Sequence, residues 1–364
     1  MEYTLRSLGS FSEMKYGKMP NKKMSSDKGK YPIFSGYRVV GYCDECNIGE
    51  QQLVVVARGV GGTGDVKLSP GACFLTNLSI AVLVDESVAL KKYLYYYFLK
   101  NNLRYLDSGS AQSQITIGDL KNVEVPLPSI ETQKKVVSIL DVIDEKINNN
   151  VAINDNLADL LQTIYQERFG NDILAVNQGV LSDICSYSRD KVAVSELNVR
   201  TYFSTENMLS GKAGSTEATS LPTTSQTTAC HKGDTLISNI RPYFKKIVYC
   251  EDKCGCSTDV LCFTPSQPCY SAYLFSTLYA DKFFAFMVAG SKGTKMPRGD
   301  KQQIMTYPVV LPSEEELAGF NTIASPLLEQ IYSNRAENKR LSILRDTLLP
   351  KLMSGEIDVS AVQL

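Results

Sequence analysis

The chain has 364 residues, of which 43% are hydrophobic and 21% are charged, so it can bury sizeable cores and is not expected to be disordered. We expect no signal peptide, because the first residues contain no apolar h-region, and no membrane span, because no run reaches about 18 apolar residues. We therefore expect a cytoplasmic protein whose ten cysteines are reduced. The net charge of −1 gives no support for a protein that binds nucleic acid through overall basic charge.

Charge alternates along the chain, however. Lys and Arg outnumber Asp and Glu by 15 to 12 in residues 1–128 and by 14 to 12 in residues 171–313. Acidic residues prevail elsewhere, by 7 to 4 in residues 129–170 and by 8 to 5 in residues 314–364. Two slightly basic regions are therefore each followed by a slightly acidic one.

Residues 1–128 are predicted to form a first α/β domain. Short β-type runs, such as residues 53–59, are separated by the Gly, Pro and Ser residues that are typical of turns. One aromatic segment, residues 90–106, is predicted to be helical. This domain is expected to end where a long helix begins.

A glycine motif of the form G-x-G-x-x-G occupies residues 59–64, after a predicted strand. A dinucleotide-binding fold would need a helix to begin there, and Pro70 and Gly71 would stop it almost at once. The motif therefore favours a tight β-turn over a cofactor site. A loop whose backbone N–H groups approach a DNA phosphate stays an alternative.

Two long helices are predicted, over residues 129–170 and 314–355, and a tail follows at residues 356–364. The second helix repeats the first when Asn334 is aligned with Asn150: apolar positions recur at alternating steps of three and four, and Asn coincides with Asn twice. This spacing is that of a coiled-coil seam, in which a polar Asn can fix the register. The seam is expected to comprise Val136, Leu140, Ile143, Ile147, Asn150, Asn154, Leu157, Leu161, Ile164, Phe320, Ala324, Leu327, Ile331, Asn334, Asn338, Leu341 and Leu348; only Arg345, which matches Leu161, breaks the pattern.

The two helices are expected to pack antiparallel, because the domain between them must return the chain to its start. The alternative is two ordinary amphipathic helices, each packed on its own domain. The coincident Asn positions favour the coiled coil.

Residues 171–313 are predicted to form a second α/β domain that resembles the first. The strand-like residues 235–241 match residues 53–59, and residues 270–288 form its aromatic helical segment. Closely spaced cysteines near residue 250 suggest a metal site, but zinc usually needs four well-placed ligands and buried free thiols are the default expectation. The single histidine, His231, gives no support for a Ser-His-Asp site.

The expected fold is thus α+β: two globular α/β domains separated by two long antiparallel coiled-coil helices, with a pseudo-two-fold internal repeat. A helix of about 40 residues spans about 60 Å. Two similar domains held apart by such helices suit DNA with two separate half-sites. Because the domains differ in detail, the target is expected to be bipartite and asymmetric, with an unread spacer.

The chain resembles the specificity (S, HsdS) subunits of Type I restriction–modification systems over nearly its whole length. The resemblance is most specific in the helical regions and weaker in the domains, which are target-recognition domains in that family. The segments that carry it are residues 338–357 (NKRLSILRDTLLPKLMSGEI), 119–135 (DLKNVEVPLPSIETQKK), 237–243 (ISNIRPY) with 256–259 (CSTD), and 31–36 (YPIFSG) with 58–59 (RG).

The resemblance implies a non-catalytic subunit that chooses the DNA sequence in a restriction system for phage defence. It implies two methylation (M) subunits as partners, which carry S-adenosylmethionine and perform DNA methylation at adenine. Restriction (R) subunits that use ATP and magnesium are possible further partners. This chain itself is expected to hold no cofactor and no metal.

DNA contacts are expected from polar and basic residues in glycine-rich loops. Arg pairs with guanine and Asn or Gln with adenine in the major groove, whereas Lys more often contacts phosphate. For any single Lys, a solvated surface charge is the plainer interpretation, and Arg241 has a second one as the structural ion-pair partner of Asp259. The candidates are Lys15, Lys18, Lys22, Lys23, Lys30, Arg58, Asn77, Ser110, Gln112 and Gln114 in the first domain, and Arg200, Asn239, Arg241, Lys245, Lys246, Lys292, Lys295 and Arg298 in the second.

Two other functions stay open at this point. One is a coiled-coil adaptor that binds proteins and has no DNA specificity. The other is a freestanding enzyme that acts through a cysteine or through the glycine loop.

Overall fold

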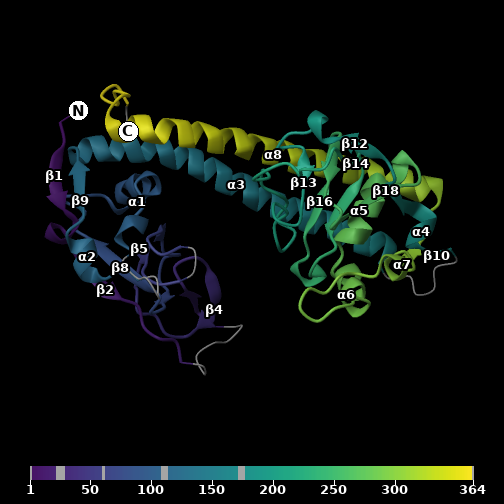
Figure 1. Ribbon diagram of the computed structural model, residues 1–364, viewed down its shortest axis with the longest axis horizontal. Helices are drawn as coiled ribbons and strands as arrows, with labels where there is room; N and C mark the ends of the chain where they lie inside the picture. Colours follow the sequence, from purple (N-terminus) through teal and green to yellow (C-terminus); the bar gives the residue numbers. More distant parts are fainter. Residues whose placement is uncertain (1, 22–28, 60–61, 108–113, 171–176, 363–364) are drawn as a thin grey trace. The chain divides into compact units, whose positions relative to one another are not determined.

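The computed structural model separates into two compact units. The first unit comprises Met1–Asn148 and Asn338–Leu364, and the second comprises Asn149–Glu337. Both boundaries fall inside two long helices, α3 (Ile130–Phe169) and α8 (Glu314–Ser354), so each unit holds a part of both helices (Figure 1). The structure describes residues 2–21, 29–59, 62–107, 114–170 and 177–362.

Two antiparallel sheets and one mixed sheet build the first unit. β1 (Thr4–Ser7) pairs with β9 (Glu124–Leu127), next to the start of α3. The other elements are the antiparallel sheet β2 (Ser12–Tyr16), β8 (Ser79–Val84), β5 (Leu53–Val56) and β6 (Val66–Leu68), in that order; the mixed sheet β4 (Val39–Cys43), β3 (Tyr31–Phe34) and β7 (Phe74–Leu75); the helices α1 (Lys91–Lys100) and α2 (Ile117–Lys121); and the 3-10 turns η1 (Leu8–Ser10) and η2 (Arg104–Leu106).

The second unit is built in the same way. β10 (Gln178–Val180) pairs with β19 (Pro308–Val310) beside the start of α8. Its other elements are the antiparallel sheet β11 (Cys185–Tyr187), β18 (Val260–Pro265), β15 (Thr235–Ser238) and β16 (Ile247–Tyr249); the sheet β12 (Lys191–Ala193), β14 (Gln226–Cys230), β17 (Cys254–Cys256) and β13 (Tyr202–Phe203); the helices α4 (Leu181–Ile184), α5 (Ser271–Tyr279), α6 (Asp281–Ala289) and α7 (Lys301–Ile304); and the 3-10 turns η3 (Val194–Glu196), η4 (Pro242–Phe244) and η5 (Pro268–Tyr270).

The internal repeat is confirmed in the strand topology. The strand order β2-β8-β5-β6 of the first unit recurs as β11-β18-β15-β16 in the second. Both central strands, β5 and β15, are buried at every residue, as expected of strands that are covered on both faces. The predicted α+β fold class with two long helices is confirmed.

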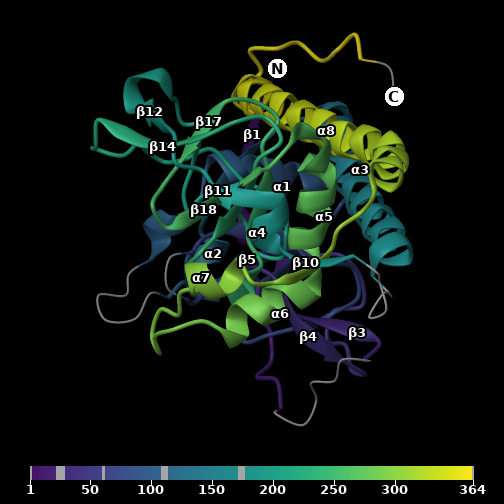
Figure 2. The same ribbon diagram turned by 90° about the vertical axis from the view of Figure 1, so that its right-hand side faces the viewer.

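One predicted helical segment is divided in the structure. The sequence suggested a single helix over residues 270–288, but α5 ends and α6 begins at Ala280, whose backbone is extended. The break lets both short helices bury aromatic side chains, including Tyr273 in α5 and Phe283 in α6. Figures 1 and 2 show α5 beside the sheet that contains β15 and β18.

The two long helices begin at equivalent serines. At the start of α8, Ser313 and Glu316 form a capping box: the Glu316 N–H donates to the Ser313 Oγ, and the Ser313 N–H donates to the Glu316 carboxylate. These hydrogen bonds lower the pKa of Glu316. At the start of α3, the Thr132 N–H donates to the Ser129 Oγ, and Ser129 is the residue that the internal repeat aligns with Ser313. Within the described ranges, no helix combines the length and the apolar character that a membrane span needs.

α3 and α8 pack antiparallel within each unit. In the first unit, Val136 and Leu140 share a core with Leu349 and Leu352. The same core contains Leu8 from the start of the chain. The start of α3 therefore contacts the end of α8, so the two helices are antiparallel here, as predicted.

The second unit shows the same antiparallel contact. Phe320 packs against Tyr165 and Phe169, with ring centroids 6.4 Å and 5.5 Å apart. Further along, the buried Asn334 amide donates to the Asn154 carbonyl oxygen over 2.9 Å. The pair is polar and enclosed, so it opposes a shifted register, which would leave both amides without partners.

The seam positions that the sequence suggested all lie at least half-buried. Val136, Leu140, Ile143, Asn150, Asn154, Leu161, Phe320, Ala324, Ile331 and Asn334 are buried, and Ile147, Leu157, Ile164, Leu327, Asn338, Leu341 and Leu348 are half-buried. Arg345, which breaks the pattern, forms an ion pair of 2.9 Å with Asp144 on α3. Its long side chain keeps the position in contact with the neighbouring helix despite its charge.

Asn154→Ala should lower the free energy of unfolding by about 1–3 kcal/mol, because it leaves the Asn334 amide buried without its acceptor. Replacing both residues by leucine should restore most of that loss, since no polar group is then stranded. Urea unfolding of the full chain measures both effects. Asn149→Ala, at an exposed position of α3, is the control, and an equal effect of Asn154→Ala and Asn149→Ala would show that the pair contributes nothing.

Candidate nucleic-acid interface

Three segments of the second unit meet at the end of β15. They are the loop of residues 239–246, the turn of residues 257–259 and the segment of residues 290–300, which together we call the second loop surface. The Asn239 N–H donates to the Asp259 carbonyl oxygen over 2.8 Å, and the Gly299 N–H donates to the Asn239 carbonyl oxygen over 3.3 Å. The candidate residues Asn239, Arg241, Lys245, Lys246, Lys292, Lys295 and Arg298 all lie on these segments.

The first unit repeats this arrangement at the end of β5. The Ala57 N–H donates to the Leu78 carbonyl oxygen over 2.9 Å, and the Ile115 N–H donates to the Ala57 carbonyl oxygen over 3.0 Å. The β-bridge between Arg58 and Gln114 matches the bridge between Ile240 and Arg298. We call residues 57–59, 76–78 and 114–116 the first loop surface.

Three of the first-domain candidates, Arg58, Asn77 and Gln114, therefore come together on the first loop surface. Lys18 adjoins it, because the Asn77 N–H donates to the Lys18 carbonyl oxygen over 3.0 Å. Lys15, on β2, and Lys30, beside the ring of Tyr31, lie outside the surface. Lys22, Lys23, Ser110 and Gln112 lie outside the described residues.

The glycine motif lies in the connection between β5 and β6, which are antiparallel neighbours. This topology is that of a hairpin, whereas a dinucleotide-binding fold needs a helix and a parallel strand after the motif. Gly59 and Gly64 have φ values of +141° and +93°, which side chains other than glycine rarely adopt. Val60 and Gly61 lie outside the described residues, and the described part of the motif agrees with the turn that the sequence favoured.

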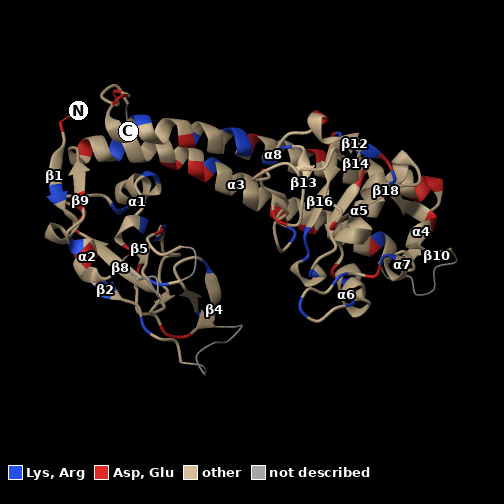
Figure 3. Ribbon diagram, in the orientation of Figure 1, with Lys and Arg blue, Asp and Glu red and all other residues tan. Residues whose placement is uncertain are grey.

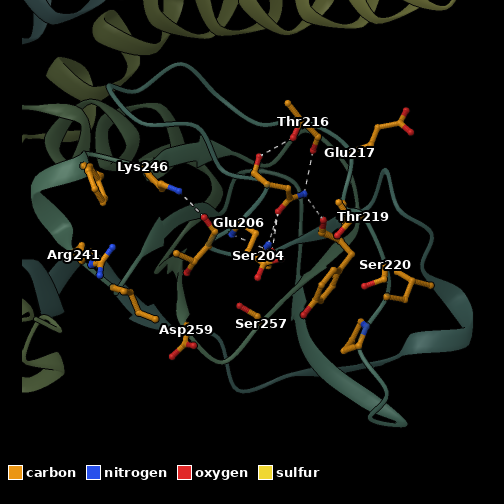
Figure 4. A pocket seen from close by; sticks show the side chains of 18 of the residues that line it. Ser204, Glu206, Thr216, Glu217, Thr219, Ser220, Arg241, Lys246, Ser257 and Asp259 are labelled. Carbon is orange, nitrogen blue, oxygen red and sulfur yellow. Dashed lines mark hydrogen bonds between the residues drawn. The ribbon is translucent and has the colours of Figure 1, made fainter. Parts of the chain in front are cut away.

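A cavity of about 730 Å³ opens beside the second loop surface. Arg241 and Lys246 lie on one side of it and Thr219 and Ser220 on the other, as Figure 4 shows. Arg200 pairs with Glu217, a residue of this far wall, over 3.1 Å. The candidate Arg200 therefore belongs to the border of the same cavity.

The loop of residues 239–246 is held in an unusual backbone conformation. Arg241 and Lys245 both have φ of +51°, in the left-handed region, which costs of order 1 kcal/mol for a side chain other than glycine. Between them, Tyr243 and Phe244 are 50% and 38% exposed, with ring centroids 4.7 Å apart. The loop thus displays two aromatic rings between two basic residues.

Three of the six cations of the second loop surface, Lys245, Lys292 and Arg298, are paired with carboxylates. Lys292 pairs with Asp300 over 2.5 Å and Lys245 with Asp281 over 3.0 Å. The hydrogen bond from Lys292 lowers the pKa of Asp300, and hydrogen bonds from Lys212 and Lys245 lower that of Asp281, so these carboxylates are ionised at neutral pH. Lys246 donates to the Thr205 carbonyl oxygen over 2.6 Å, and burial lowers its pKa.

Arg241 differs from these cations. The alternative in which Arg241 pairs with Asp259 is wrong, because Asp259 pairs with Arg298 over 3.0 Å. Within the described part of the chain, the buried Nε of Arg241 has no hydrogen-bond acceptor and its guanidinium forms no ion pair. A buried donor without an acceptor costs about 1–3 kcal/mol.

The basic residues at the first loop surface are not paired in this way. Arg58 and the adjoining Lys18 are exposed, and no carboxylate pairs with them among the residues that the structure describes. Exposed cations without partners can contact phosphate without breaking an internal ion pair. The two surfaces therefore share a backbone plan but differ in their chemistry.

The cysteines of the second unit form part of its core. Cys230, Cys250, Cys254, Cys256 and Cys262 are buried together, and the Cys254 and Cys250 sulfurs are 3.6 Å apart. Within the described ranges, no group of three or more His, Cys, Asp or Glu residues has a geometry that could hold a metal ion. All ten cysteines are free thiols.

The sequence indicated Asp259 only as an ion-pair partner of Arg241, and it did not identify the acidic residue Glu206. Glu206 lies in a loop rich in Ser, Thr and Gly, and it lines the cavity only because the chain folds back there. The sequence contains no signal for that contact.

Comparison with known proteins gives a consistent result. Residues 1–158 match the family model of the Type I restriction modification DNA specificity domain. A type I specificity subunit of Mycoplasma pneumoniae is 30% identical over 166 residues, 43% of this chain and 44% of that protein. The specificity subunit of a Type I restriction enzyme from Methanocaldococcus jannaschii is 23% identical over 348 residues, 78% of this chain and 73% of that protein.

The fold also matches a solved structure. The crystal structure of a Type I restriction–modification S subunit from Mycoplasma genitalium aligns with a TM-score of 0.64 and 21% identity, covering 97% of this chain and 96% of that one. In sequence, the chain spans less than half of the Mycoplasma pneumoniae relative. The names of these relatives agree with the expectation of a non-catalytic specificity subunit.

Arg241→Gly should leave the chain as stable as the parent or up to about 1 kcal/mol more stable, because glycine adopts a positive φ without strain. Urea unfolding measures the change. Lys295→Gly is the matched control: Lys295 is exposed and its φ is not positive, so glycine there only adds freedom to the unfolded chain and should lower stability. Equal destabilisation by both substitutions would show that Arg241 is not strained.

Proposed function

Since this chain carries the Type I restriction modification DNA specificity domain and matches the specificity subunits of these systems in sequence and fold, we propose that it selects the DNA target of a Type I restriction–modification complex. The observation that carries the proposal is the repeated loop surface. Equivalent segments converge in each unit, and they bring together three of the candidate residues in the first unit and seven in the second.

The target is bipartite and asymmetric under this proposal. Equivalent positions of the two loop surfaces carry different side chains: Arg58 matches Ile240, Asn77 matches Asp259, and Gln114 matches Arg298. Base recognition depends on the donors and acceptors that a protein presents in the groove, so the two surfaces select different sequences. The stretch of DNA between the two half-sites is not read.

Each region of the chain has its own role under this proposal. Residues 1–128 and 171–313 are the target-recognition domains, residues 129–170 and 314–355 are the helical spacers, and residues 356–364 are the tail. Figure 3 shows Lys and Arg in the loops beside α6, within the second recognition domain. This placement supports contact between these loops and DNA, because basic residues gain counterion-release free energy at phosphates.

Catalysis resides in the partners of this chain. Two methylation subunits with S-adenosylmethionine modify adenine, and restriction subunits with ATP and magnesium join the complex for cleavage. The relatives named as parts of Type I restriction enzymes support these partners. The chain itself contributes the choice of sequence and the surface on which the complex assembles.

Salt dependence of DNA binding tests the proposal. For the full chain assembled with its methylation subunits, the logarithm of the association constant should fall steeply and linearly with the logarithm of the salt concentration. The double variant Lys18→Ala with Arg58→Ala should reduce that slope by about 2, because each lost phosphate contact removes about one unit.

Lys100 and Lys134 provide the control, because both are exposed lysines of the first unit and lie outside its loop surface. Substituting both by alanine should leave the slope nearly unchanged. If binding to DNA is weak and all three proteins show the same shallow slope, the chain is an adaptor that binds proteins and not a DNA-reading subunit.

A further inference from the structure

The cavity of the second unit contains a cation and a carboxylate that do not satisfy each other. Arg241 and Glu206 both line it, and no ion pair joins them within the described residues. Neither has another charged partner there. Two opposite charges that face one cavity and remain unpaired leave room for a ligand that offers both an acceptor and a donor.

Both residues are held by their neighbours. On the Glu206 side, the Thr205 carbonyl oxygen accepts from Lys246, and the Asn207 side-chain amide donates to the Tyr202 and Thr216 carbonyl oxygens over 2.9 Å and 3.0 Å. On the other side, the Arg241 N–H donates to the Pro297 carbonyl oxygen over 2.8 Å. The two side chains therefore project from fixed backbone, as direct readout requires.

The carboxylate of Glu206 disfavours a phosphate in this cavity. Glu206, Glu217 and Asp259 all line it, but Glu217 is paired with Arg200 and Asp259 with Arg298, so it is the charge of Glu206 that repels a phosphate anion. Of the two cations, Lys246 already donates to the Thr205 carbonyl oxygen, which leaves Arg241. A neutral group with its own hydrogen-bond donors and acceptors fits this mixture better, and the edge of a base pair is such a group.

A G·C pair offers the complementary pattern in the major groove. Guanine presents its O6 and N7 acceptors, which an arginine fork contacts together, and cytosine presents an N4 amino donor, which a carboxylate accepts. Where adenine replaces the guanine, its N6 amino donor faces the arginine and the thymine O4 acceptor faces the carboxylate, so both residues disfavour this orientation of an A·T pair. Where thymine replaces the guanine, the adenine N6 amino group still donates to the carboxylate, and Arg241 alone discriminates, because thymine O4 is a single acceptor.

We propose that Arg241 and Glu206 jointly read one G·C base pair in the half-site that the second recognition domain selects, Arg241 contacting the guanine and Glu206 the cytosine. This inference rests on the proposed function, because it requires that the second loop surface faces DNA. It adds the identity of one base pair and the two residues that determine it.

The test compares adenine methylation across the genome of the native host, by long-read sequencing, for the parent gene and for Arg241→Lys and Glu206→Gln at the same locus. Lysine keeps the charge but loses the fork, and glutamine keeps the shape but loses the carboxylate. Both variants should methylate sites that differ from the parent motif at one shared position, where the parent has G·C. Discrimination there should fall by about 5- to 100-fold.

Lys212→Ala is the control, since Lys212 also has a positive φ, of +65°, is paired with Asp281 over 2.6 Å and lies outside the second loop surface; its motif should equal the parent's. Urea midpoints of the purified variants show whether each protein is folded.

If the folded variants methylate the same motif as the parent, or relax it at two different positions, Arg241 and Glu206 do not read one base pair together. The proposed function stands in that case. A parent that methylates no split motif overturns both proposals.

Discussion

The antiparallel packing of α3 against α8 is the constraint on which both units depend, because each unit is assembled from segments far apart in the chain. In the first unit, Leu349, Leu352 and Met353 from the end of α8 complete a core that begins with Leu8. The Tyr3 hydroxyl donates to the Met353 carbonyl oxygen over 3.2 Å, which links the two ends of the chain. In the second unit, Phe320 of α8 packs against Tyr165 and Phe169 of α3. Burial of large apolar side chains of this kind stabilises a fold by about 1.5–3 kcal/mol each.

The internal repeat keeps the backbone arrangement of the two loop surfaces the same, while their side chains differ. Backbone hydrogen bonds hold the three segments of each loop surface together, and they make no demand on the side chains that project from them. Arg58 and Ile240 occupy equivalent positions in β-bridges, although one is charged and the other apolar. Such a division lets the side chains of the loop surfaces change without disturbing the strands beneath them.

The sequence predicted the parts of the fold that depend on periodicity. The repetition of one long segment by the other, the apolar steps of three and four and the coincident Asn residues were sufficient to identify two long antiparallel helices. Local deviations were not predictable. The break at Ala280 depends on how two short helices bury their aromatic rings, and the pairing of Asp259 with Arg298 depends on a loop conformation. For the candidate site, the sequence singled out Arg241 by its type and place. That no carboxylate pairs with Arg241 among the described residues, and that Glu206 lines the same cavity, are properties of the folded chain.

The central claim is that this chain determines which DNA sequence is methylated. Genome-wide adenine methylation in the native host, measured by long-read sequencing with and without the gene, tests it most directly. The account predicts that removal of the gene abolishes methylation at one split motif with a fixed spacer and leaves every other methylated motif unchanged. Unchanged methylation at all motifs, in cells that express the methylation subunits, would contradict it.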